Sequence, residues 1–188
     1  TTAKASLIDG GQVSVTTEYE VGGSGNLRRW LQGTGHPIKV PVVDLSEVSA
    51  GGGSIAWVDD GGGLRVGPQS AGAAPGPACY GAGGQEPTVT DADVILGYLN
   101  AKHLLGGKLA LSPDKAAEAI QRRVGDRLRL DIIGAAQGIV DIVNSSMANA
   151  IRMISVERGY DPRSLTLVAF GGAGPVHAGR LAEQLDIA

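Results

Sequence analysis

Cysteine is nearly absent from this chain of 188 residues, which has only Cys79. A single thiol excludes an internal disulfide and a CxxC metal site. Aromatic residues make up only 4% of the sequence, so the core must be built from Val, Ile, Leu and Ala. Long apolar runs are also missing, and none approaches the roughly 20 residues that a membrane-spanning helix needs. The composition predicts one globular domain without disulfides or membrane spans.

A strong charge of one sign is missing as well. The net charge is −3, and the 16 Lys and Arg residues are scattered. Without a basic stripe or interleaved aromatic residues, nucleic acid is a poor candidate partner. No charged segment followed by an apolar run opens the chain, so we expect no signal peptide and a cytoplasmic setting. Because the first residue is Thr1 rather than Met, we expect a piece excised from a longer polypeptide.

Glycine, by contrast, is abundant, with 30 residues, about twice the usual share. The excess is clustered at positions 10–11, 22–23, 51–53, 61–63, 83–84, 106–107 and 171–172. Clusters of this kind are typical of tight turns and of places where backbone approaches another group closely.

The first half of the sequence predicts short strands joined by these turns. We expect a hairpin of residues 4–9 and 12–20 around Gly10-Gly11, an exposed excursion over 22–36, a strand at 38–44, and a second hairpin of 55–58 with 64–66. Residues 67–90 are rich in Gly, Pro and Ala and have no period. An irregular stretch of this length is often functional or disordered.

The second half predicts helices. Thr90 is expected to cap a helix over 91–99, and Ser112 with Pro113 a helix to about Gly125. The best helical periodicity follows Asp131, with apolar residues three and four apart as far as Ile154. A buried strand over 165–170 and a last helix from Pro175 to about Leu185 complete the prediction. The element order predicts a mixed α/β sheet flanked by helices, in one domain over 1–188.

The sequence VAFGGAGPVHAG at 168–179 is a candidate ligand site. A buried strand that ends at Gly171-Gly172 before a helix presents free N–H groups and a helix dipole where ligands often bind. The alternative is a plain strand-to-helix turn. His177, in the first helical turn, is either a ligand contact or a buried histidine bonded to a nearby carbonyl. Neither a dinucleotide fingerprint nor a P-loop is present.

Two other turns are weaker candidates for binding anions. The hydroxyls of Thr1 and Thr2 and the ammonium of Lys4 precede a strand and offer contacts to phosphate oxygens. Residues 50–54, AGGGS, form either an anion nest or a flexible turn. No His, Asp and Glu residues have metal-ligand spacing, so a metal held by protein side chains is not expected.

Two remaining features have plain structural alternatives. Cys79 is more consistent with a small buried side chain than with a nucleophile, because no nearby charge in the sequence would lower its pKa. Asn149 and Arg152 are helical neighbours that face either a binding cleft or solvent.

Several long motifs together resemble the hydantoinase A/oxoprolinase family. They are AGGGSIAWVDDGGGLRVGPQSAGAAPGPACYGAGG at 50–84, PTVTDADVILGYLN at 87–100, MANAIRMISVERGYDP at 147–162 and VAFGGAGPVHAG at 168–179. The resemblance covers nearly the whole chain. It departs at Ala74, where family members usually have Asp, and at Ser49, where many have Gly.

The resemblance implies a ribonuclease H-like fold of the actin/Hsp70/sugar-kinase ATPase type, in which ATP lies between two lobes. This chain would be the C-terminal lobe, and the first lobe of the same polypeptide would be its partner. Thr1, Thr2 and Lys4 would then face phosphate, while Gly171, Gly172, Gly174 and His177 would lie on the adenosine side. Asp44, Ser54 and Asn149 would be candidate catalytic residues.

The resemblance also implies ATP-dependent opening of cyclic amides such as hydantoins or oxoproline, through phosphorylation of a carbonyl oxygen, with Mg²⁺ on the phosphates. A second large subunit of the hydantoinase B type is an expected partner. The alternatives are a subunit of an ATP-dependent ketone carboxylase and a non-catalytic module for nucleotide sensing or assembly. The fragment alone is not expected to turn over ATP.

Overall fold

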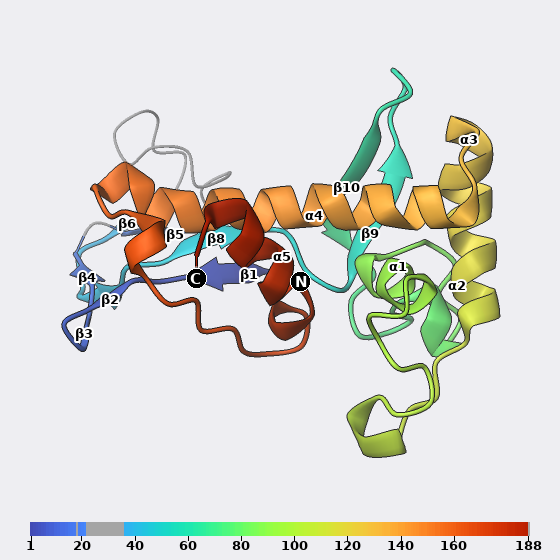
Figure 1. The fold of residues 1–188 in the computed structure, drawn as a ribbon, viewed down its shortest axis with the longest axis horizontal. Helices are drawn as coiled ribbons and strands as arrows, with labels where there is room; N and C mark the ends of the chain where they lie inside the picture. Colours follow the sequence, from blue (N-terminus) through green and yellow to red (C-terminus); the bar gives the residue numbers. More distant parts are fainter. Residues whose placement is uncertain (18, 22–35, 188) are drawn as a thin grey trace.

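The computed structural model describes residues 1–17, 19–21 and 36–187, and its long axis follows one helix, α4 (Ile132–Ile154) (Figure 1). Asp131 caps this helix, since its carboxylate accepts the Gly134 N–H at 2.7 Å. The predicted apolar stripe is buried along α4, and the helix packs against α1, α2, α5, β1, β8 and β10. The long helix predicted from its periodicity is therefore confirmed.

The amino-terminal strands are shorter than predicted. β1 (Ala3–Ala5) pairs antiparallel with β8 (Ser46–Val48), and β2 (Ile8–Asp9) pairs with β3 (Gln12–Val13) through a turn at Gly10 and Gly11, which both have positive φ. β4 (Val15–Thr16) pairs with β7 (Val42–Val43), and β5 (Tyr19–Val21) pairs with β6 (His36–Ile38). The predicted turn at 10–11 is confirmed.

Two predictions for this region differ from the structure. The strand expected over 38–44 is interrupted between β6 and β7, where Pro41 has no N–H to donate to a ladder. The strand β8 was not predicted. The excursion expected over 22–36 lies outside the described residues except for His36.

The second predicted hairpin is confirmed and is longer than expected. β9 (Ser54–Val58) pairs with β10 (Leu64–Ser70), with an irregularity in register between Val66 and Ser70. Asp59 closes the turn by accepting the Gly63 N–H at 2.7 Å and the Arg65 Nε–H at 2.7 Å. The hairpin projects from one side of α4 (Figure 1).

The helices beyond this hairpin form one end of the molecule. They comprise η1 (Ala78–Tyr80), α1 (Val89–Ile95), η2 (Leu105–Gly107), α2 (Pro113–Ile120), a π-helical turn η3 (Gln121–Gly125) and α3 (Asp126–Leu128). Ser112 caps α2 as predicted. The predicted cap of the first helix was wrong: Thr88, not Thr90, is the N-cap, and it forms a reciprocal capping box with Asp91.

The segment after α4 contains the clearest error of the sequence prediction. Two 3₁₀ turns follow, η4 (Val156–Arg158) and η5 (Pro162–Ser164), and then α5 (Gly174–Leu185). Residues 165–170 are not a buried strand: Val168 is 76% exposed and Phe170 is 84% exposed. Burial still alternates along this segment, but it pairs with no strand in the described part of the chain.

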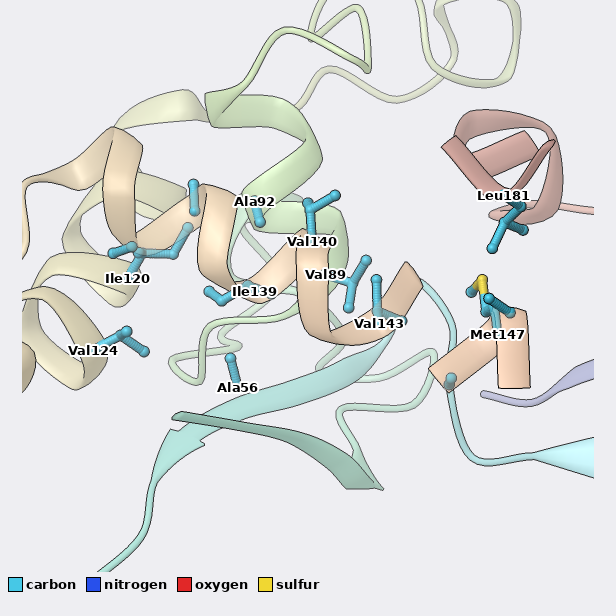
Figure 2. Packing of buried hydrophobic residues seen from close by; sticks show 14 of the residues in the cluster. Ala56, Val89, Ala92, Ile120, Val124, Ile139, Val140, Val143, Met147 and Leu181 are labelled. Carbon is cyan, nitrogen blue, oxygen red and sulfur yellow. The ribbon is translucent and has the colours of Figure 1, made fainter. Parts of the chain in front are cut away.

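The main core lies along α4, where aliphatic side chains from α1, α2, α5 and β9 meet it (Figure 2). Ile139, Val140 and Val143 of α4 face Val89 and Ala92 of α1, and Met147 faces Leu181 of α5. This core has no aromatic residue, as the composition predicts. The chain is thus a mixed α/β protein, although its described strands form five two-stranded sheets rather than the single flanked sheet expected.

No helix in the described residues is both long and apolar enough to cross a membrane.

Candidate functional site

The amino terminus packs directly on the glycine turn between β8 and β9. A Cβ built on Gly53 would lie 2.6 Å from Thr1 Oγ1, and one built on Gly51 would lie 2.8 Å from Thr1 Cγ2. Real Cβ atoms do not approach other atoms so closely, so the glycines allow this contact. Thr1 also shares a hydrogen bond of 2.6 Å with the Ser70 hydroxyl at the end of β10. The predicted anion-binding segments at residues 1–4 and 50–54 therefore lie together.

The third turn approaches the same place. A Cβ built on Gly52 would lie 3.9 Å from the Cβ of Ala173, at the start of α5, and 2.7 Å from Thr90 Oγ1. Thr90 fixes Gly52 by donating to its carbonyl twice, from the N–H at 2.8 Å and from the hydroxyl at 2.9 Å. Residues far apart in the sequence thus form one group of turns, which we call the turn cluster: Thr1, Gly51–Gly53, Ser70, Thr90 and Gly171–Gly174.

The part of the turn cluster before α5 is open. A Cβ on Gly171, Gly172 or Gly174 would meet nothing within 4 Å. Among the described residues, no acceptor takes the N–H groups of Gly172, Ala173 or Gly174. Unpaired N–H groups at the start of a helix carry partial positive charge and favour anions.

Ser54 lies beneath the turn cluster and supports it. Its side chain is 1% exposed and accepts the Gly51 N–H at 3.1 Å. Its own N–H donates to the Gly51 carbonyl at 2.9 Å. The structure therefore gives Ser54 a role in shaping the turn, and its predicted catalytic role stays a prediction.

Thr2 and Lys4 lie on the exposed side of the amino-terminal segment. Lys4 Nζ forms an ion pair of 3.0 Å with Glu47, its cross-strand partner on β8. Thr2 is exposed. Their predicted contact with phosphate remains a prediction.

Asp44 and Asn149, the other candidate catalytic residues, lie in two different settings. Asp44 is 2% exposed and forms an ion pair with both terminal nitrogens of Arg158, one of them at 2.9 Å. Asn149 is exposed on α4 and accepts a hydrogen bond of 3.1 Å from Arg152, which also donates to the Gln184 carbonyl at 3.0 Å. Neither residue contacts the turn cluster through a described hydrogen bond.

His177 is enclosed rather than open to a ligand. It is 1% exposed, and its Nε2 lies 3.7 Å from Oδ2 of Asp93 on α1. Burial lowers the pKa of His177 and raises the pKa of Asp93 to about 7. The sequence prediction of an adenosine contact at His177 is untested, and its neighbour is a carboxylate rather than the carbonyl of the alternative interpretation.

Asp91 joins the irregular Pro-rich stretch to α1. Its fully buried carboxylate accepts from the N–H groups of Cys79 at 2.7 Å and Ala78 at 3.3 Å, and from the Thr88 hydroxyl at 2.8 Å. Cys79 is fully buried, and burial together with the Asp91 charge raises the pKa of its thiol. The expectation of an inert, buried cysteine is therefore confirmed.

The sequence analysis missed the supporting roles of Thr88, Asp91 and Asp93. The spacing Thr88-x-x-Asp91 is a capping-box pattern and contained the signal for the first two. Asp93 had no comparable signal, because its partner lies 84 positions away in the sequence. The described residues contain no group of three His, Cys, Asp or Glu side chains placed to hold a metal ion.

Short paired strands, glycine turns and helices packed along α4 define a mixed α/β protein. Comparison with known proteins gives the family: the model described as hydantoinase/oxoprolinase matches residues 1–188. The chain belongs to the hydantoinase/oxoprolinase family.

The relatives include enzymes of two kinds. The caprolactamase alpha subunit of Pseudomonas jessenii is 46% identical over 178 residues, which are 95% of this chain and 26% of that protein. A crystal structure of the ATP-dependent caprolactamase from the same organism matches 80% of this chain and 22% of its own with a TM-score of 0.75 and 50% identity. A nucleotide-free structure of acetone carboxylase matches 100% of this chain and 25% of its own with a TM-score of 0.84 and 28% identity. The chain spans about a quarter of the length of two of its curated relatives, including the caprolactamase subunit, and 12% to 20% of the length of the carboxylase subunits and oxoprolinases.

Proposed function

We propose that these 188 residues are the second nucleotide-binding lobe of an ATP-dependent enzyme that opens cyclic amides. The observation that supports this most directly is the turn cluster. It combines an open glycine turn, unpaired N–H groups at the start of α5 and the hydroxyls of Thr1 and Ser70. The ribonuclease H-like arrangement of the parent protein belongs to this proposal.

The chemistry follows from the problem that an amide presents. An amide nitrogen is a poor leaving group, and transfer of a phosphoryl group to the carbonyl oxygen makes ring opening feasible. The residues of this chain would contribute positioning and charge stabilisation, which dominate phosphoryl transfer. The free N–H groups of Gly172, Ala173 and Gly174 would bind a phosphate-bearing ligand, and the backbone at Gly171 and Gly172 would allow its close approach.

The described residues do not form a carboxylate cage for Mg²⁺. The turn cluster offers hydroxyl and backbone groups, while the buried Asp44 is paired with Arg158. Any Mg²⁺ that accompanies a nucleotide would take most of its ligands from the phosphates and water.

A second candidate function is a subunit of an ATP-dependent ketone carboxylase. The acetone carboxylase structure favours it, because that match extends over the whole of this chain. Both functions activate an oxygen of a carbonyl or carboxylate group, and nothing in the described turns distinguishes their substrates. A partner subunit and the first lobe belong to both candidates.

Nucleotide binding and product analysis of the complete gene product test the proposal. Calorimetry should detect ATP and ADP binding. An amidase should release an amino acid from caprolactam or oxoproline, or an N-carbamoyl amino acid from hydantoin, only when ATP is present. Carboxylation of acetone with bicarbonate would favour the second candidate. Nucleotide binding without turnover of any substrate would leave a non-catalytic sensing module, and an absence of nucleotide binding would contradict both enzymes and leave only an assembly module.

A further inference from the structure

Asp93 on α1 and His177 on α5 form a polar contact in the interior. The two side chains are 2% and 1% exposed, and Oδ2 of Asp93 lies 3.7 Å from Nε2 of His177. Within the described part of the chain, Asp93 Oδ1 and His177 Nε2 have no hydrogen-bond partner. Burial of such polar groups lowers the stability of the fold unless they interact with each other. An aliphatic pair at these two positions would give a more stable fold.

Each residue of the pair lies one helical turn from the turn cluster. Thr90, three residues before Asp93, holds the Gly52 carbonyl through its N–H and its hydroxyl. His177 lies three residues after Gly174 and donates its N–H to the Ala173 carbonyl at 3.4 Å. The contact therefore connects the two helices whose first turns bring Gly52 and Ala173 together.

We propose that Asp93 is a positioning residue that acts through His177 to hold the Gly172–Gly174 turn against Gly52 for an incoming phosphate group. This inference rests on the nucleotide binding proposed above. Neither side chain touches the ligand. Together they fix the direction of the free N–H groups before binding, which reduces the entropy cost of binding an anion there.

The protonation of the pair gives the proposal a specific signature. Burial raises the pKa of Asp93 to about 7 and lowers that of His177, so the pair is neutral between the lowered pKa of His177 and about pH 7 and carries one negative charge above about pH 7. Few other titratable groups face it. α4 buries no charged residue, Asp91 is bonded to the backbone of η1, the Cys79 thiol stays protonated, and Arg180 of α5 pairs with Glu183 at the surface.

The negative charge opposes anion binding at the adjacent turn, so nucleotide affinity should fall as the pH rises through 7. Calorimetry of ADP binding to the complete gene product between pH 6 and 8 should give a Kd that rises by about fivefold or more. Asp93→Asn keeps the shape of the side chain but cannot ionise, so the Kd of this variant for ADP should not show the rise with pH. Asp114→Asn, an exposed aspartate on α2, is the matched control and should follow the unsubstituted protein.

A second measurement does not depend on nucleotide. Hydrogen exchange of the Val176 and His177 amides, which donate to the Ala173 carbonyl, should become faster in Asp93→Ala and His177→Ala, while exchange in the β9–β10 hairpin should not change. Conservative Asp93→Asn should restore protection, which distinguishes a positioning contact from a loss of fold.

The outcomes separate the two proposals. If the unsubstituted protein binds ADP but Asp93→Asn keeps the same pH dependence, or Asp93→Ala leaves both exchange and affinity unchanged, the positioning role is wrong. If the unsubstituted protein binds no nucleotide, the proposed function fails, and the exchange measurement alone decides whether the pair holds the turn.

Discussion

The ion pair between Asp44 and Arg158 shows how one residue can connect distant parts of the chain. Asp44 follows β7, whereas Arg158 belongs to η4 beyond the long helix. Because the carboxylate is 2% exposed, removing its charge weakens its hydrogen bonds to the guanidinium in a place where water cannot replace them. This pair offers a structural reason for Asp44 that does not require catalysis.

Asp44→Asn should lower the free energy of unfolding by about 1–3 kcal/mol, the range for hydrogen bonds to a charged group, because the carboxylate is buried while Arg158 is partly exposed. Urea denaturation measures the loss. Asp161→Asn is the control, since its pair with Arg163 is exposed and should cost less than about 1 kcal/mol. Catalytic loss in Asp44→Asn without loss of stability would instead favour the catalytic role predicted from the sequence.

Asp93 and His177 should impose opposite pH dependences on stability. The raised pKa of Asp93 means that the folded state binds a proton that the unfolded state releases, so stability falls as pH rises from about 4 to about 7. The lowered pKa of His177 means that the unfolded state binds the extra proton, so stability falls as pH drops below 6.5. In the unsubstituted protein the two slopes oppose each other just below pH 6.5, in the range where the unfolded histidine is protonated and the folded one is not.

Single substitutions should reveal each slope. Asp93→Asn leaves the histidine, so its unfolding midpoint should decrease on acidification below 6.5. His177→Asn leaves the aspartate, so its midpoint should decrease on going from pH 5 to 7. Denaturation curves at several pH values measure both, and parallel profiles in the two variants would contradict the assignment.

At the scale of elements, the two glycine turns of the turn cluster have different physical reasons for their glycines. Gly51–Gly53 lack a Cβ because Thr1 and Thr90 occupy that space. Gly172 lacks one although the space is empty, and no packing requirement in the described residues explains it. The first turn is thus a matter of folding, and the second is the better candidate for ligand contact.

This difference predicts separable effects on stability and binding. Gly53→Ala should destabilise the protein by about 1–3 kcal/mol, because the new methyl group would overlap Thr1 Oγ1. Gly172→Ala should change stability by less than about 0.5 kcal/mol and should weaken nucleotide binding. Thermal denaturation and calorimetry on both variants test this, and equal losses of stability would contradict it.

At the scale of the whole molecule, cooperative unfolding should centre on α4, because the main core lies along it and α1, α2, α5, β1, β8 and β10 pack against it (Figure 2). Residues 165–170 are the opposite case. The burial of their side chains alternates as in a strand, and Leu167 packs on the core. However, no described strand pairs with this segment. The amides of Ile139–Val143 should therefore exchange slowest and those of Thr166–Phe170 among the fastest when this chain is studied alone.

Hydrogen exchange followed by mass spectrometry measures that contrast. Strong protection of 166–170 in the isolated chain would mean that the segment finds a strand partner within these residues or in a second copy.

Local rules account for the parts of the fold that the sequence predicted correctly. The 3.6-residue period of apolar residues predicted α4, and the Ser-Pro pair predicted the start of α2. Two successive glycines, which adopt positive φ, predicted the turn between β2 and β3. The cap of α1 was misplaced by two residues because three potential cap residues occur in succession, and only the reciprocal bonds of Thr88 and Asp91 select among them. The segment 165–170 has a strand pattern, but a strand also needs a neighbour, and pairing is not encoded locally.

The sequence by itself determined the chemistry available: glycine turns, scattered charge, an aliphatic core, and motifs that identify the hydantoinase/oxoprolinase family. Only the tertiary structure decided which of those groups meet. It placed Thr1, Gly52 and Ala173 together, gave Asp44 an arginine partner and enclosed His177 against Asp93. The physical reason is that turns and helices obey local backbone preferences, whereas the candidate site depends on contacts between residues from about 40 to about 120 positions apart, which only the packed chain brings together.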